Sequence, residues 1–261
     1  MSVLLAFDTA TEQMNIALAL RGAVTVHEAA GGALASATLI PAILGLLSAA
    51  GLTLRDVDAI GFGRGPGAFT GLRTACSVAQ GLAFGAAKPV LPLDTLLAVA
   101  EDARGAAQAA GAGAQAFTVW VAMDARMNEI YAAQYQFNAD ADVDGPAQGW
   151  QVLAAPMLIS PQALSQRWQL DPPAHIAGNA VEVFGALLEA PGAVLWPQAR
   201  PRAAALMAVA QAQWQHSGGV GLDAALALPL YLRDKVAQTT VERDLARQVK
   251  DALKAALELG A

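Results

Sequence analysis

A short stretch near the start of the chain, "FDTAT", carries residue types that could bind phosphate. It ends an apolar run with Asp8 and continues with Thr9 and Thr11, which offer a carboxylate and two hydroxyls. Phosphate loops place glycine beside such groups, because backbone amides must approach the phosphates closely. Ala10 occupies that place, so a strand cap followed by a turn explains the stretch equally well. These residues are the candidate cofactor-binding residues, although we expect the chain to bind no cofactor.

A glycine-rich loop, "GRGPGAFTGLR" at residues 63–73, offers a second phosphate-binding pattern. Its first two glycines and Ala68 match the G-x-G-x-x-G/A spacing of dinucleotide-binding loops. That motif needs an acidic residue about twenty positions later, yet none occurs between Arg64 and Leu93, and no Lys-Ser/Thr pair completes a P-loop. We therefore expect left-handed glycines that shape the entry into a helix at Thr70.

Other signals of metal or nucleophilic chemistry are weak. The acidic stretch Asp140–Gly145, within a predicted loop over 138–149, starts like a calcium loop, but the twelfth position is Gln151 instead of glutamate. Cys76 lies among small apolar residues and is predicted to be a core residue. The three histidines are far apart in the sequence: His27, His175 and His216. We predict no catalytic residues and no metal site.

The composition excludes several classes of protein. A formal charge of −6 argues against a surface that grips nucleic acid through phosphate neutralisation. A single cysteine excludes an internal disulfide and fits a reducing compartment, and the first residues lack the basic region of a signal peptide. The uncharged stretch from Ala29 to Leu54 contains glycine and proline and is better explained by a soluble helix than by a membrane span. We expect a cytoplasmic protein.

The elements that must position these residues alternate between strands and helices. Strand-like runs and helices in turn predict mixed sheets with helices on their faces. Both halves open with strand, aspartate, turn and strand, as in "LLAFDTATEQMNIALAL" and "VWVAMDARMNEIYAAQY". Helices are also expected over 180–190 and 202–215. We predict an N-terminal lobe over 1–112, a C-terminal lobe over 113–235 and an amphipathic tail helix over 236–261.

Two predicted helices, over 36–50 and 70–86, lack the charged residues that a surface helix normally turns to water. Leu39, Ile40, Ile43, Leu44 and Leu47 form an apolar stripe on the first helix, and small residues cover its other side. Another protein could cover such faces, or the chain's own second half could. For an intermolecular interface, the predicted residues are Thr38, Leu39, Ala42, Gly45, Leu46, Ala49, Arg64, Phe69, Thr70, Arg73, Ser77 and Gln80.

Five stretches together resemble the TsaB (YeaZ-like) family of bacterial proteins for threonylcarbamoyladenosine biosynthesis in tRNA. They are "FDTAT", "GRGPGAFTGLR", "AQGLAFG", "MDARMNEIYAA" and "PLYLRD", in order between Val3 and Asp234. The resemblance implies an α/β protein with the duplicated actin/Hsp70-like (ASKHA) fold, its two lobes each a mixed sheet flanked by helices. It also implies that the two helices named above form the surface used for partners. Relatives often carry a His-Ser pair where this chain has Ala35-Ser36.

The resemblance implies a non-catalytic scaffold subunit. Such proteins pair with the catalytic subunit TsaD, which TsaE, an ATPase, joins, and they form homodimers when alone. The complex transfers a threonylcarbamoyl group to the adenosine next to the anticodon, so tRNA is contacted only indirectly and no membrane is involved. TsaD has a His-x-x-x-His metal site on the helix that corresponds to "DTLLAVAED", where this chain has no histidine.

Two enzymatic alternatives remain open at this point. An ATP-dependent phosphotransferase of the same fold would use Asp8 and Thr9 at the phosphates and Asp124 as a base. A peptidase is the other, although the sequence offers neither a metal pair nor a catalytic triad.

Overall fold

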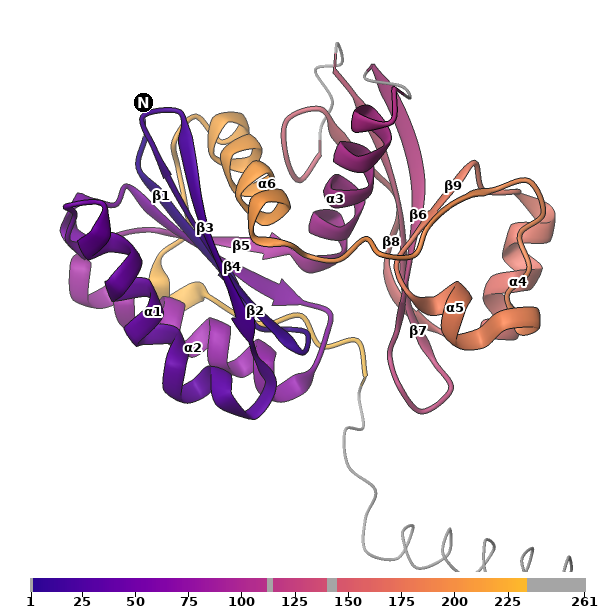
Figure 1. Ribbon diagram of the computed structural model, residues 1–261, viewed down its shortest axis with the longest axis horizontal. Helices are drawn as coiled ribbons and strands as arrows, with labels where there is room; N and C mark the ends of the chain where they lie inside the picture. The colour runs from indigo at the N-terminus through magenta and orange to yellow at the C-terminus, as the bar shows by residue number, and fades with distance from the viewer. Residues whose placement is uncertain (1, 112–114, 140–144, 234–261) are drawn as a thin grey trace, which may run out of the picture.

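The computed structural model describes residues 2–111, 115–139 and 145–233, and it contains two five-stranded sheets (Figure 1). In the first sheet the strand order is β3-β2-β1-β4-β5, and β1 pairs antiparallel with β2 and parallel with β4. The strands are β1 (Leu4–Asp8), β2 (Gln13–Leu20), β3 (Ala23–Ala30), β4 (Ala59–Gly65) and β5 (Val90–Asp94).

The second sheet repeats this design in the order β10-β9-β6-β7-β8. Its first strand, β6, also lies centrally, antiparallel to β7 and parallel to β9. The strands are β6 (Ala116–Asp124), β7 (Ile130–Asn138), β8 (Trp150–Ile159), β9 (His175–Ala177) and β10 (Val194–Trp196). The duplication inferred from the two similar openings is therefore confirmed.

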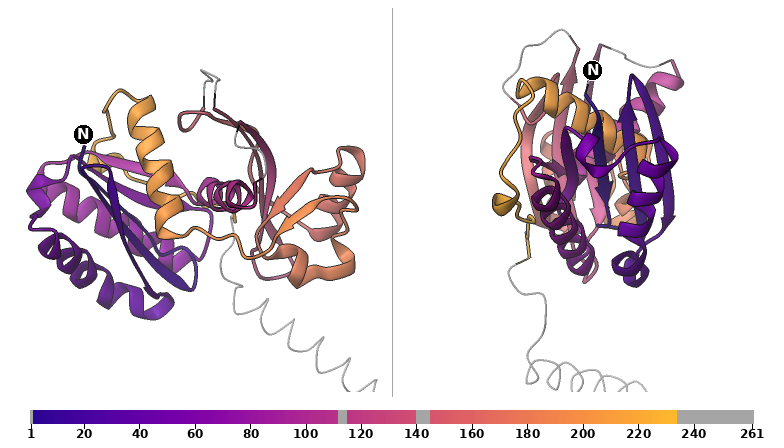
Figure 2. Two further views of the ribbon diagram at one scale, coloured as in Figure 1. Left: turned by 45° about the horizontal axis from the view of Figure 1, so that its top comes forward. Right: turned by 90° about the vertical axis from the view of Figure 1, so that its left-hand side faces the viewer.

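Helices form three layers around the sheets. The α-helices are α1 (Ala35–Ala49), α2 (Phe69–Ala86), α3 (Thr95–Ala109), α4 (Pro161–Leu170), α5 (Ala180–Phe184) and α6 (Ala203–His216), and the short 3-10 turns are η1 (Gly32–Leu34), η2 (Leu54–Asp56), η3 (Gly185–Leu187) and η4 (Ala224–Leu226). α1 and α2 cover the outer face of the first sheet, whereas α3 and α6 lie between the two sheets (Figure 2). α4 and α5 cover the outer face of the second sheet (Figure 1).

The buried stripe of α1 explains how this uncharged helix packs. Ala35, Leu39, Ile43 and Leu47, each four residues apart, are buried against the first sheet. A spacing of four residues keeps side chains on nearly the same face of an α-helix. The predicted helix is therefore confirmed, and its remaining side chains are left for its outer face.

Two elements differ from the sequence-based expectations. The helix predicted over 180–190 is wrong in its extent, because α5 ends at Phe184 and a 3-10 turn follows. α4 was not predicted, although Ser160 caps it by accepting the Ala163 N–H at 3.2 Å and Pro161 begins it.

The chain returns to the first sheet after building most of the second. α6 packs on β1 and β2, and Leu222 exchanges two backbone hydrogen bonds of 2.9 Å with Val90. The connection between α3 and β6 spans the predicted boundary at 112, but the lobe ranges themselves remain a prediction. The predicted tail helix over 236–261 lies outside the described residues, and so does the acidic stretch 140–144.

Candidate functional site

Asp8 is fully buried at the end of β1 and does not face the space between the lobes. Its Oδ1 accepts the Ala10 N–H at 2.7 Å, and its Oδ2 accepts the Thr95 hydroxyl at 2.8 Å. The Thr95 oxygen in turn accepts the Gly65 N–H at 3.1 Å. Burial raises the pKa of Asp8 to about 6, against the opposing effect of these two hydrogen bonds. Asp8 therefore joins three segments of the first lobe.

The neighbouring threonines also serve the fold. The Thr9 side chain is buried and donates to the Gly71 carbonyl at 2.7 Å, which fixes the turn after β1 to α2. Thr11 accepts the Gln13 N–H at 3.2 Å and borders the cleft described below. Among the three candidate cofactor-binding residues, Asp8 and Thr9 are thus wrong, because their polar atoms are buried and engaged within the protein.

The glycine-rich loop packs directly against the β1–β2 turn. A Cβ at Gly63 would lie 1.6 Å from Asp8 Oδ2, and one at Gly71 would lie 1.8 Å from the Thr9 carbonyl oxygen. The Ala68 N–H donates to the Ala10 carbonyl at 2.8 Å. Within this loop, Gly65 alone has a positive φ, so close approach rather than left-handed backbone explains most of its glycines. The loop holds the turn in place and begins α2 at Phe69.

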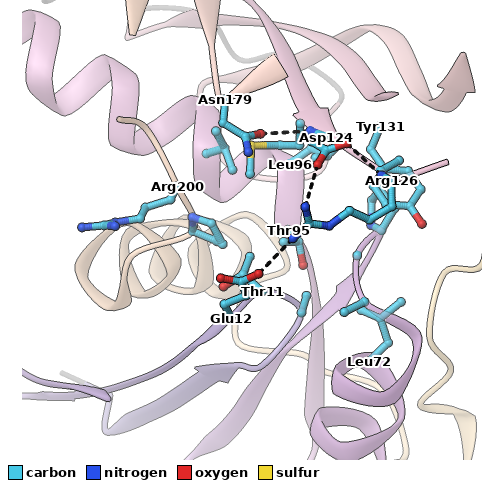
Figure 3. A pocket seen from close by; sticks show the side chains of 18 of the residues that line it. Thr11, Glu12, Leu72, Thr95, Leu96, Asp124, Arg126, Tyr131, Asn179 and Arg200 are labelled. Carbon is cyan, nitrogen blue, oxygen red and sulfur yellow. Dashed lines mark hydrogen bonds and ion pairs between the residues drawn. The ribbon is translucent and has the colours of Figure 1, made fainter. Parts of the chain in front are cut away.

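A cleft of about 710 Å³ lies between the two lobes (Figure 3). An ion pair of 2.9 Å joins Glu12 on the first lobe to Arg126 on the second. Asp124 accepts the Arg126 N–H at 2.8 Å and pairs with its guanidinium at 3.2 Å. The Asn179 side chain accepts the Asp124 N–H at 2.9 Å. Asp124, the base required by the phosphotransferase alternative, is thus engaged by its own turn.

A second buried carboxyl lies where the two lobes meet. Asp94 caps α3 by accepting the Leu96 N–H at 2.9 Å, and the Tyr135 hydroxyl from the second sheet donates to it at 2.7 Å. Burial raises the pKa of Asp94, and burial together with the adjacent carboxylate raises the pKa of Tyr135 well above its ordinary value. This contact ties α3 to the second sheet.

The outer face of α1 and α2 exposes about half of the predicted interface residues. Exposed are Thr38, Gly45, Ala49, Thr70, Arg73 and Ser77, and partly buried are Ala42, Leu46, Phe69 and Gln80.

Two predicted interface residues are wrong. Leu39 is fully buried in the core beneath α1, because it belongs to the stripe that packs on the chain's own sheet. Arg64 is half-buried, and its charge lowers the pKa of Asp94, so it lies toward the interior and not at the rim of α2.

The sequence analysis missed three apolar residues on this outer face. Ile40 and Leu44 were assigned to the buried stripe of α1, yet they are 40% and 48% exposed. Phe84, on the last turn of α2, is 86% exposed. The four-residue spacing of Leu39, Ile43 and Leu47 could have separated the buried stripe from these neighbours.

Among the described residues, no three histidine, cysteine, aspartate or glutamate side chains are placed to hold a metal ion. In the same part of the chain, no helix combines the length and apolarity needed to cross a bilayer.

Two sheets of identical strand order, flanked by helices around a common cleft, define a duplicated α/β actin-like fold. Comparisons with known proteins agree. Residues 25–241 match the family model described as "TsaD: tRNA N6-adenosine threonylcarbamoyltransferase". The structure superposes on "YeaZ from Pseudomonas aeruginosa" with a TM-score of 0.72 and 35% identity, over 89% of this chain and 100% of that one.

Curated relatives carry the same family name. A "tRNA threonylcarbamoyladenosine biosynthesis protein TsaB" from Haemophilus influenzae is 41% identical over 62% of this chain and 66% of its own length. The protein of that name from Escherichia coli is 36% identical over 64% of this chain and 66% of its own length. The matches thus span about two thirds of these relatives. The chain belongs to the TsaB (YeaZ-like) family.

Proposed function

We propose that the chain is a non-catalytic scaffold subunit required for threonylcarbamoylation of the adenosine next to the anticodon in tRNA. In this proposal it binds the catalytic subunit TsaD, and TsaE joins the pair. The names of the curated relatives support the pathway, and the match to the TsaD family model supports a pairing of like folds.

The outer face of α1 and α2 carries the proposal of a partner surface. Surface helices normally expose charged side chains, yet Arg73 is the one charged residue among all positions of these two helices. Ile40, Leu44 and Phe84 add exposed apolar area to the same face. An apolar, nearly uncharged face of this kind is typical of a protein–protein interaction site.

Three exposed helical glycines on this face support close packing by a partner. A Cβ at Gly45, Gly81 or Gly85 would meet no atom within 4 Å, so the chain's own packing does not require glycine there. Glycine in a helix costs about 0.5–1 kcal/mol relative to alanine. Small residues permit a neighbouring helix to approach closely, which would offset that loss. We propose that the same face mediates self-pairing when the partner is absent.

The phosphotransferase alternative has less support. It would need Asp8 and Thr9 at bound phosphates, whereas both side chains are buried and hydrogen-bonded within the first lobe. Its base, Asp124, is paired with Arg126.

The wider organisation is part of the proposal. We keep the division into lobes over 1–112 and 113–235 and a tail helix over 236–261, and we place the protein in the cytoplasm.

Reconstitution of the reaction tests the scaffold proposal. Purified TsaD, TsaE, threonylcarbamoyl-adenylate and unmodified tRNA should yield modified adenosine, measured by mass spectrometry, when this chain is added and not when it is omitted. An Asp124→Asn variant should support the same yield, because the proposal gives Asp124 no chemical role. Product formed by this chain alone, or loss of product with Asp124→Asn despite intact binding to TsaD, would contradict the proposal.

A further inference from the structure

The segment 227–233, which we call the C-terminal strap, links α2 to the second lobe. It follows η4, and it runs from the back of α2 toward the second sheet (Figure 1). Its last four residues line the cleft. It contains most of the motif "PLYLRD", for which the proposed scaffold role gives no explanation.

One end of the strap is fixed along α2. The Ala227 carbonyl accepts hydrogen bonds from Cys76 Sγ at 3.3 Å and from Gln80 Nε2 at 3.0 Å. Further on, the Leu230 N–H donates to the Arg64 carbonyl at 2.7 Å. The strap therefore follows any displacement of α2 or of the end of β4.

Tyr231 places the strap within the proposed partner surface. Its ring lies 5.2 Å from the Phe69 ring, and its hydroxyl accepts the Arg73 Nε–H at 3.1 Å. The Arg73 guanidinium also lies over Phe69, 3.9 Å from the ring centre. Tyr231 is 42% exposed, so a partner that covers Phe69 and Arg73 would also reach Tyr231.

The other end of the strap is fixed to the β6–β7 turn of the second lobe. Arg233 pairs with Glu129 at 2.6 Å and donates to the Ala125 carbonyl at 3.1 Å. Three consecutive residues of this turn, 126–128, have positive φ, a backbone conformation that non-glycine residues adopt only with support. Arg233 supplies such support, and the same turn carries Arg126, which reaches across the cleft to Glu12.

We propose that the C-terminal strap couples the partner surface on α2 to the width of the cleft between the lobes, with Arg233 as a positioning residue. A partner that fixes Phe69, Arg73 and Tyr231 narrows the range of positions open to the strap, and through Arg233 the range open to the β6–β7 turn. Because coupling between two sites is reciprocal, a chain with a loosened lobe binds that partner more weakly. This inference rests on the proposed binding of TsaD.

Distance measurements across the cleft test the coupling in the full chain. Spin labels at Arg55→Cys on η2 and Gln162→Cys on α4, both exposed, report the separation of the lobes by electron–electron double resonance, while Cys76 is buried and stays unlabelled. Arg233→Gln should broaden the distance distribution of the free chain. The same variant, without labels, should weaken TsaD binding about five- to tenfold in calorimetry. Arg167→Gln, on α4, is the matched control and should change neither.

The outcomes separate the strap from the scaffold proposal. A distribution unchanged by Arg233→Gln would overturn the strap proposal, and so would a broadened distribution with unchanged TsaD affinity. Addition of TsaD to the labelled chain should narrow the distribution, and no narrowing despite measured binding would also overturn it. If the unmodified chain fails to bind TsaD, the proposed function itself fails, whatever the free chain's distances show.

Discussion

The buried carboxyl of Asp8 predicts a pH dependence of stability that an Asp8→Asn variant should lose. The folded-state pKa is about 6, because burial disfavours the carboxylate, whereas the ordinary value is 3.8. The folded state therefore holds a proton that the unfolded chain has released between about pH 4 and pH 6. Stability falls with rising pH wherever the folded state binds more protons.

The interval between these pKa values sets the size of the effect. One pKa unit corresponds to about 1.4 kcal/mol, so ionised Asp8 lowers the free energy of unfolding by about 3 kcal/mol above pH 6 relative to pH 4. Asparagine cannot ionise. The stability of the natural chain minus that of Asp8→Asn should thus fall by about 3 kcal/mol between pH 4 and pH 7.

Urea unfolding at a series of pH values measures this difference. Subtraction of the two curves cancels the other titrating groups that both proteins share. Asp171→Asn, which removes an exposed carboxyl at the end of α4, controls for the loss of one negative charge. A difference between the natural chain and Asp8→Asn that stays constant from pH 4 to pH 7 would refute the structural role assigned to Asp8.

Three further predictions concern packing and association. Gly71→Ala should lower the free energy of unfolding by more than about 4 kcal/mol, because its Cβ would lie 1.8 Å from the Thr9 carbonyl oxygen. Near-normal urea unfolding of that variant would show that the loop does not hold the turn. Tyr135→Phe should lower stability by about 1–3 kcal/mol, since Asp94 loses a buried hydrogen bond, and an unchanged unfolding midpoint would contradict this. Phe84→Ser should reduce self-association in sedimentation velocity without destabilising the chain, and dimers as stable as before would argue against the outer face of α2.

Periodicity and repetition made much of the fold predictable. The two similar openings predicted two sheets of like design, because the same sequence pattern was placed under the same physical constraints twice. The helices over 36–50 and 70–86 followed from their apolar spacing. The extent of α5 did not, because Gly185, with φ of +51°, ends that helix through backbone geometry that neighbouring residues do not reveal.

The candidate site was harder to predict, since it depends on contacts between distant segments. Asp8 resembles a phosphate ligand in sequence, and its burial becomes clear only when Thr95, 87 residues away, bonds to it. Arg64 stands in a glycine-rich loop that looks exposed, yet the fold turns it inward. The contacts of Arg233 with the β6–β7 turn span more than 100 residues, which no local pattern encodes.

The central claim is that the outer face of α1 and α2 binds TsaD, and Gly45→Arg tests it most directly. Gly45 is exposed with open space around it, so an arginine there fits the fold and improves helix propensity. Gly105→Arg is the matched control, because Gly105 is an exposed helical glycine with equally open surroundings on α3. In calorimetric titrations with TsaD, Gly45→Arg should weaken binding at least about a hundredfold, a loss of about 3 kcal/mol. Gly105→Arg should bind like the natural chain. Equal affinity of Gly45→Arg and the natural chain for TsaD would contradict the account.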